Sequence, residues 1–134
     1  GHDISPEENQ YQAGLNFTIS YKKEFNFIGR EALEKIKDKK IDRKFAMFVL
    51  KNNEPGKPLL LHDEPIYLDD KIIGRTTSGN YSFNFNKNLT FGYVEKDLSN
   101  LDTSKNKLYV EVGKVKYEAE YLAKPLNQNN FKTI

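Results

Sequence analysis

The chain has 134 residues, which is long enough for one compact core and too short for two ordinary domains. Its 21 basic and 19 acidic side chains nearly cancel, and few of the basic ones are arginine, so nucleic acid is not expected as a partner. The absence of cysteine excludes disulfides, thiolate metal sites and a cysteine nucleophile. No apolar run approaches the roughly 18 residues of a membrane span, which predicts a soluble, cytoplasmic protein without a membrane partner.

The first 40 residues combine polar loop with three candidate elements. The segment Ser5-Pro6-Glu7-Glu8 is suited to a single helical turn, because proline fits the first helical position and acids favour a helix N-terminus. Residues 15–21 alternate between apolar and polar side chains, which predicts a half-buried strand. Apolar residues then recur at helical spacing, so a helix is expected from about residue 29 to residue 39.

Beyond residue 42 the pattern becomes typical of short strands. Strands are predicted at residues 45–50, 65–68, 71–75, 90–95, 107–112 and 115–122. The stretch after the third of these is expected to pass through a β-bulge into a loop, because Gly74 and Gly79 accept conformations or close contacts that other residues avoid. Several short strands joined by turns indicate an antiparallel barrel or sandwich.

The sequence holds no self-contained catalytic motif. It lacks the glycine patterns that bind dinucleotides and phosphates, the nucleophile elbow of hydrolases and the zinc-protease motif. His2 and His62 are not in a metal-ligand spacing, so no metal site is expected. Thr76, Thr77 and Ser78 offer hydroxyls either to the backbone of a turn or to a ligand, and the residues alone leave both interpretations open.

Four segments, read in order, resemble a known family. They are residues 1–15, 27–33 (FIGREAL), 73–82 (IGRTTSGNYS) and 91–94 (FGYV). Together they resemble aminomethyltransferase, the T-protein of the glycine cleavage system, and its relatives in dimethylglycine and sarcosine dehydrogenases. The segment Glu64-Pro65-Ile66-Tyr67 is closer to the dehydrogenase-linked branch, whereas Gln12 departs from the family, which usually has glutamate there.

The resemblance implies a mainly β fold of the α+β kind. A small antiparallel Greek-key β-barrel is expected, with one N-terminal strand–helix appendage. Residues 1–40 would be the tail of a preceding folate-binding domain plus a connecting helix, and residues 41–134 the C-terminal barrel domain. The numbering starts without methionine, so a larger protein is expected, with folate-binding domains upstream.

The resemblance also implies a function, namely one-carbon transfer from an amine to tetrahydrofolate. The partners would be the upstream folate-binding domains and a small-molecule amine or a lipoyl carrier, with FAD in the full-length protein of the dehydrogenase branch. The family's catalytic residues lie upstream, so no catalytic residue is expected here and the chain alone should be inactive. The candidate contacts with tetrahydrofolate are Arg75, Thr77, Ser78 and Tyr81.

The alternative hypothesis is a non-catalytic barrel module for small-ligand binding or for docking to another domain. It predicts an exposed apolar surface around Leu15, Phe17 and Phe27. A polar surface there would contradict both this alternative and the expectation of missing domains.

Overall fold

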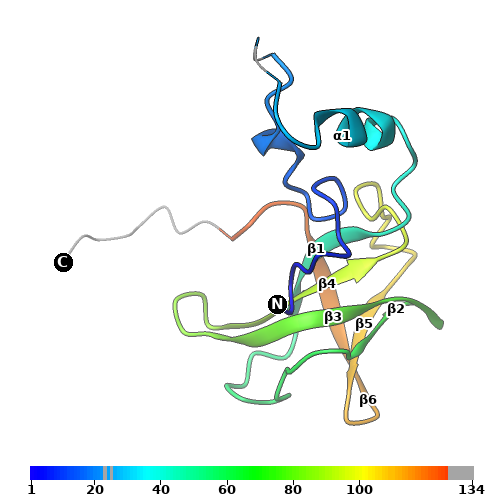
Figure 1. Cartoon of the computed structure of the whole chain (residues 1–134). Coiled ribbons are helices and arrows are strands. Elements are labelled where there is room, and N and C mark those ends of the chain that lie inside the picture. Colours follow the sequence, from blue (N-terminus) through cyan, green and yellow to red (C-terminus); the bar gives the residue numbers. More distant parts are fainter. Residues whose placement is uncertain (23, 25, 127–134) are drawn as a thin grey trace.

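Six antiparallel strands close into a barrel in the computed structural model, which describes residues 1–22, 24 and 26–126 (Figure 1). The strands are β1 (Lys44–Leu50), β2 (Pro65–Leu68), β3 (Lys71–Ser82), β4 (Lys87–Val94), β5 (Leu108–Val112) and β6 (Val115–Leu122). Around the barrel their order is β1-β4-β3-β2-β5-β6, and β6 closes the ring by pairing with β1. Because β2, β3 and β4 are sequential neighbours and β1 lies beyond β4, this is a Greek key, as predicted.

The hydrophobic core fills the barrel interior. Along each strand, inward side chains alternate with outward ones, so every strand contributes at least one apolar side chain to the inside. These buried residues are Phe48, Leu50, Ile66, Ile73, Val94, Val110 and Ala119. The interior is therefore packed with side chains and leaves the outer face and the loops to form any site.

The strand predicted over residues 15–21 is wrong. The structure has a single 3₁₀ turn, η1 (Asn16–Thr18), in which Thr18 donates from its N–H and its hydroxyl to the Leu15 carbonyl at 3.0 and 2.7 Å. A strand needs a neighbour to pair its backbone groups, and the closed barrel offers no free edge. The helix is confirmed as α1 (Arg30–Lys37), and no residue of it is buried. Among the residues that the structure describes, no helix is long and apolar enough to cross a membrane.

Strand β3 is longer than predicted. Instead of ending near residue 75 it continues through both glycines to Ser82, while its register against β4 shifts between Thr76 and Ser78. The predicted bulge is therefore confirmed, whereas the prediction of a loop after it is wrong, because these residues continue the strand. A Cβ on Gly74 would lie 2.0 Å from the Tyr93 carbonyl oxygen, so this glycine is needed where β3 and β4 approach closely.

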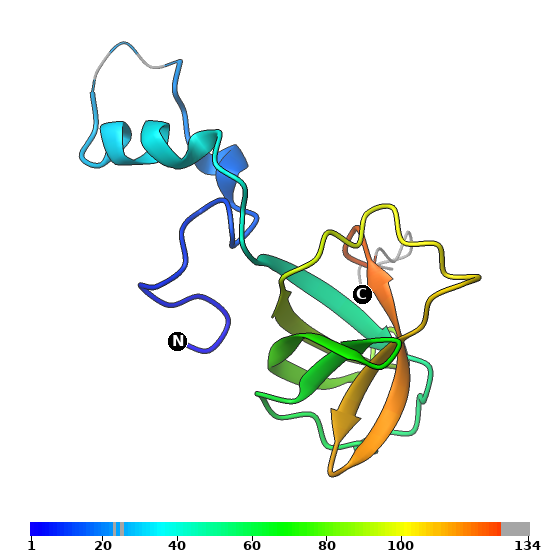
Figure 2. The same cartoon turned by 90° about the vertical axis from the view of Figure 1, so that its right-hand side faces the viewer.

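The N-terminal segment, residues 1–14, lies against the outer face of β1, β4 and β3, while α1 stands away from the barrel (Figure 2). The Phe45 N–H donates to the Gln12 carbonyl at 2.8 Å, which continues the hydrogen bonding of β1 into the segment. Ala13 is buried beside this contact. This side of the barrel, which also carries part of the predicted site, is thus covered by the chain's own N-terminal residues.

Candidate functional site

The four predicted ligand-binding residues all lie on β3, but they do not form one cluster. Arg75 and Tyr81 are six positions apart, which is about 20 Å at the usual rise of ~3.3 Å per residue. Thr77 and Ser78 lie between them and contact a different part of the chain. The structure therefore brings Arg75 and Thr77 to the lining of one small hollow, with Ser78 beside Thr77 on Asp3, and leaves Tyr81 apart from them.

The Thr77 and Ser78 hydroxyls bind the Asp3 carboxylate. Both donate to Asp3 Oδ1, at 2.6 Å from Thr77 Oγ1 and 2.8 Å from Ser78 Oγ. Consecutive strand residues normally point to opposite faces, and the bulge is what turns both hydroxyls to the same side. In this structure the pair holds the N-terminal segment, and its contact with a cofactor stays a prediction.

Arg75 lies at an open hollow on the outer face of the barrel. Its side chain is 68% exposed, and Nη1 is 3.3 Å from Asp63 Oδ1, a pair too exposed to fix the guanidinium firmly. The hollow measures about 430 Å³ and is lined by residues of β2, β3 and β4 together with three residues that lie just before β1, just before β2 and just after β4. These are Arg43, Asp63, Pro65, Ile72, Ile73, Gly74, Arg75, Tyr93 and Glu95.

Arg43 and Tyr93 belong to the same hollow, although neither was among the residues predicted to contact a ligand. Tyr93 is buried, and this burial raises the pKa of its hydroxyl, which donates to the Asp3 carbonyl at 3.0 Å. The Arg43 guanidinium lies 5.4 Å from the centre of the Tyr93 ring and pairs with Glu8 at 2.9 Å. Tyr93 could have been selected from the sequence, because it stands in the FGYV segment that carries the family resemblance. No sequence motif marks Arg43 as a site residue.

A smaller hollow of about 200 Å³ lies under the N-terminal segment and shares four lining residues with the first, namely Arg43, Asp63, Arg75 and Tyr93. The remaining lining comes from residues of the segment itself, from the bulged part of β3 and from His62 before β2. The two hollows therefore adjoin one another around the guanidinium groups of Arg43 and Arg75. Arg43 is paired with Glu8 and Arg75 with Asp63, so an anionic ligand at these hollows would have to replace these carboxylates.

Tyr81 lies near the other end of β3, outside these hollows. Its ring contacts Phe83 edge to face, with centroids 5.1 Å apart, and its hydroxyl is 3.4 Å from Asn86 Oδ1. The Phe83 side chain is 79% exposed. Tyr81 is half-buried and packs against the exposed Phe83 ring at the β3–β4 hairpin.

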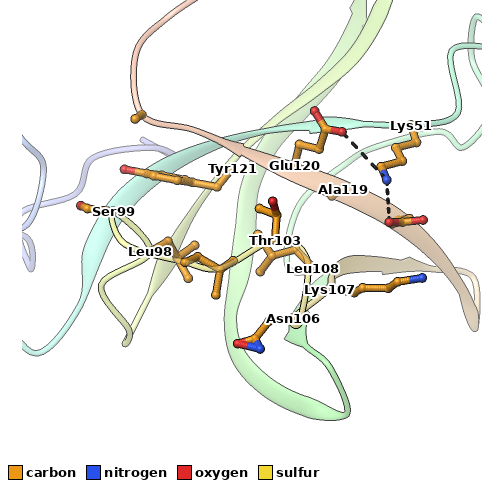
Figure 3. Close-up of a pocket in the computed structure, with 13 residues that line it drawn as sticks. Lys51, Leu98, Ser99, Thr103, Asn106, Lys107, Leu108, Ala119, Glu120 and Tyr121 are labelled. Carbon is orange, nitrogen blue, oxygen red and sulfur yellow. Dashed lines mark hydrogen bonds and ion pairs between the residues drawn. The ribbon is translucent and has the colours of Figure 1, made fainter.

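A further hollow of about 480 Å³ lies under the loop between β4 and β5, on a different side of the barrel (Figure 3). Lys51 Nζ points along its wall toward Glu118 at 2.6 Å and Glu120 at 4.0 Å. This pairing raises the pKa of Lys51 and lowers the pKa of Glu118, so both stay charged and neutralise each other. The hollow contains none of the predicted site residues, and its paired charges give no preference for a charged ligand.

The structure explains why glutamine stands at position 12, where the resembled family usually has glutamate. Its side chain is largely buried, where Oε1 accepts from the Asn9 N–H at 2.9 Å and Nε2 donates to Asp42 Oδ1 at 2.6 Å. That bond is the largest cause of the lowered pKa of Asp42. A glutamate at position 12 would face the Asp42 carboxylate without a donor, so the two residues fit each other as they stand.

Glu8 makes the N-terminal segment sensitive to acid. Its carboxylate accepts from the Ser5 hydroxyl at 2.6 Å and the Ser5 N–H at 2.8 Å, and these bonds, followed by Arg43, lower the pKa of Glu8 below 4.5. A carboxyl group whose pKa is lower in the folded state stabilises fully above its unfolded pKa and loses this effect as pH falls through the folded value. We expect Glu8→Gln to reduce the loss of stability between about pH 5 and about pH 3, measured by urea unfolding. The control is Glu7→Gln, one residue away, and equal pH profiles for the two variants would contradict the role of Glu8.

Comparisons of the sequence with known proteins all find the same family. The family described as "Glycine cleavage T-protein C-terminal barrel domain" matches residues 43–127. Human mitochondrial dimethylglycine dehydrogenase is 31% identical over 126 residues, which are 94% of this chain and 14% of that protein. The aminomethyltransferase of Listeria innocua serovar 6a is 34% identical over 125 residues, which are 93% of this chain and 33% of that protein.

The fold is similar to a solved structure. The crystal structure of glycine cleavage system aminomethyltransferase T from Bartonella henselae superposes with a TM-score of 0.67 at 20% identity, covering 88% of this chain and 32% of that one. At this identity the likeness shows the fold alone. The chain thus spans a third or less of the length of each of these proteins.

Proposed function

Because this chain belongs to the family of glycine cleavage T-protein C-terminal barrel domains, we propose that it is the C-terminal domain of a tetrahydrofolate-dependent, aminomethyltransferase-like enzyme. The reaction moves a one-carbon unit from an amine to tetrahydrofolate. The observation that carries the proposal is the family match over the whole barrel, joined to a hollow with two guanidiniums on its outer face. The groups that perform the chemistry belong to the upstream domains.

The physical task of such a domain is to position the ligand and to exclude water. Transfer to a folate nitrogen needs that nitrogen held against a reactive carbon in a site closed to solvent, because water would hydrolyse the intermediate. A barrel beside the opening supplies part of the wall. In this proposal Arg75 contacts the ligand directly, and Thr77, Ser78 and Tyr81 are further candidate contacts along β3.

The partner on the N-terminal side is proposed to be the upstream folate-binding domains of the same polypeptide. Phe17 is 80% exposed, Ile28 is fully exposed, and the apolar side of α1 has no buried residue. Exposed apolar side chains gathered on one appendage mark a surface that another domain covers. Residues 1–40 would then join the barrel of residues 41–134 to those domains.

The one-carbon donor is proposed to be a lipoyl-bound aminomethyl group or a small amine oxidised by a flavin domain. Both kinds of relative match this chain, since one is an aminomethyltransferase and the other a dimethylglycine dehydrogenase. FAD would belong to the longer polypeptide in the second case. The segment Glu64-Pro65-Ile66-Tyr67 favours the second donor, because it resembles the dehydrogenase branch of the family.

We expect Arg75→Ala to weaken tetrahydrofolate binding by roughly ten-fold or more, because a hydrogen bond to a charged group contributes about 1.5–3 kcal/mol. The measurement is calorimetric titration of a polypeptide in which the folate-binding domains precede this chain. Lys71→Ala, which removes another exposed cation from β3, is the matched control and should bind normally.

Tyr81→Ala tests the far end of β3 in the same assay. Unchanged affinity in both Arg75→Ala and Tyr81→Ala would remove the site assignment while leaving the family membership intact. A loss in Arg75→Ala alone would confine the contact to the hollow beside Tyr93.

A further inference from the structure

We propose that the hollow under the loop between β4 and β5 binds an extended peptide segment of a partner protein, which adds as a short strand to β6 beside Tyr121. The segment carries an apolar side chain opposite Tyr121 and uncharged residues on either side of it. This site contains none of the residues of the hollow around Arg75, so it is independent of the proposed one-carbon transfer.

β6 projects past the closed part of the barrel at one end. Leu108, the first residue of β5, pairs with Ala119, whereas β6 continues to Leu122. On its other side β6 stays paired with β1 as far as Leu122. Residues 120–122 therefore have a strand on one side and no strand on the other.

The alternation of backbone groups along β6 places the N–H and C=O of Tyr121 on the side without a strand. In antiparallel pairing, the N–H and C=O of one residue point to the same neighbouring strand, and those of the next residue point to the opposite one. The Lys51 N–H donates to the Glu118 carbonyl at 2.9 Å, so the backbone groups of Glu118 point toward β1. Those of Ala119 and Tyr121 therefore point away from β1. Ala119 meets β5 there, whereas Tyr121 has no strand partner among the residues that the structure describes.

The loop between β4 and β5 turns away from this edge and bonds to itself. Continuing the register of β5 by two residues would place Asn106 opposite Tyr121. Instead the Asn106 N–H donates to the Asp102 carbonyl at 3.0 Å, while the Ser104 N–H and hydroxyl donate to Asp102 Oδ1 at 3.0 and 2.6 Å. Asn106 and Tyr121 consequently lie apart, on two walls of the hollow of about 480 Å³ (Figure 3). The space for a further strand is thus beside the unpaired groups of Tyr121.

The walls of the hollow select an apolar side chain. Side chains directly opposite in paired strands lie on the same face of the sheet. The Tyr121 side chain packs against the core, with its ring 6.1 Å from that of Phe48, so the residue added opposite Tyr121 would also point inward. There the hollow is lined by Leu98, Leu101 and Leu108. Main-chain hydrogen bonds would hold the segment, and this apolar pocket would choose its side chain, as in other cases of strand addition.

The charges at the rim of the hollow balance one another. Lys51 Nζ lies 2.6 Å from Glu118 and 4.0 Å from Glu120, and Lys107 belongs to the same lining. Two acids and two bases leave no net charge for a charged residue to complement. The residues that flank the apolar one are therefore expected to be uncharged, and threonine fits because its branched side chain favours a strand.

The first test uses the full 134-residue chain without any folate, so its outcome is independent of the proposed function. The probe is an acetylated and amidated pentapeptide with leucine at its centre and threonine at the other positions. We expect it to shift the amide signals of Tyr121 and Ala123 in ¹H–¹⁵N spectra and to slow hydrogen exchange at Tyr121 about ten-fold or more. The Glu120 amide, which faces β1, should exchange at the same rate with and without the peptide.

Two altered peptides separate the hydrogen bonds from the apolar contact. Methylation of the central leucine nitrogen removes the N–H that donates to the Tyr121 carbonyl and should abolish the shifts. Alanine in place of the leucine keeps the backbone and should weaken binding about ten-fold or more. Equal affinity of the methylated peptide would overturn the proposal, and so would the absence of any shift at Tyr121 with the leucine peptide.

A pair of variants tests the location of the site. Thr103 is exposed and lines the hollow, so a tryptophan there would fill the space without disturbing the core. We expect Thr103→Trp to lower the affinity for the leucine peptide about ten-fold or more. Lys105→Trp, at an exposed position of the same loop outside the lining, should bind as the wild-type chain does. Wild-type affinity in Thr103→Trp would overturn the site. Shifts at Tyr121 that depend on the concentration of the chain alone would assign the edge to a second copy and would overturn the separate partner.

Discussion

Phe48→Ala is expected to lower the free energy of unfolding by about 3–5 kcal/mol. Phe48 is fully buried on β1, between Thr90 of β4 and Tyr121 of β6, and its ring centre lies 6.1 Å from that of Tyr121. Alanine would remove the whole ring and leave a cavity that the rigid barrel cannot close. Since domains of this size are stable by about 5–15 kcal/mol, the loss would reach a large part of the total. Urea unfolding followed by circular dichroism measures it.

The matched control is Phe83→Ala, which removes the same side chain from a position that is 79% exposed. We expect its effect to stay within about 0.5 kcal/mol, as for most surface substitutions. A loss in Phe83→Ala as large as that in Phe48→Ala would mean that the exposed hairpin, and not the barrel interior, carries the stability.

Gly74→Ala is expected to destabilise the fold by about 3 kcal/mol or more. The added Cβ would lie 2.0 Å from the Tyr93 carbonyl oxygen and 2.9 Å from the Val94 Cα. Both are backbone atoms in a paired strand, so they cannot move aside as a side-chain end could. Either β3 and β4 separate locally and lose hydrogen bonds, or the overlap remains as strain. The midpoint of thermal unfolding and the urea midpoint should both fall.

Lys71→Ala is the control for Gly74→Ala, because it places alanine on the same strand at an exposed position. It should keep wild-type stability to within about 0.5 kcal/mol. Wild-type stability in Gly74→Ala would show that the two strands separate at little cost and would contradict the close-approach role of the glycine.

Local sequence patterns predicted the strands of the barrel well, because each strand shows its alternation of apolar and polar residues within a short segment. They failed at residues 15–21, where the alternation is real but no strand edge is available for pairing, and Phe17 is left exposed. They also ended β3 too early. A glycine at position 74 or 79 predicts a break when only the strand itself is considered, whereas here each glycine provides room for atoms of another segment, as at Tyr93 and Leu60.

The candidate site was harder to predict, because it depends on contacts between distant residues. The hydroxyls of Thr77 and Ser78 could be assigned to a bulge, but nothing local indicates that Asp3 accepts from both. Arg43 was missed for a similar reason. It reaches the hollow only because Phe45 is paired with Tyr93 in the register of β1 and β4.

The closure of the barrel by β6 has a consequence for the order of folding. β2, β3 and β4 follow one another in the chain and pair as neighbours, so they can assemble early and locally. β1 can pair with β4 on one side, but its other edge remains unpaired until β6 is made, since Met47 pairs with Leu122 far along the chain. During synthesis the sheet therefore stays open until residue 122 has left the ribosome. For that interval β1 and β5 present unpaired edges, the features that make nascent β-proteins prone to aggregation and dependent on chaperones.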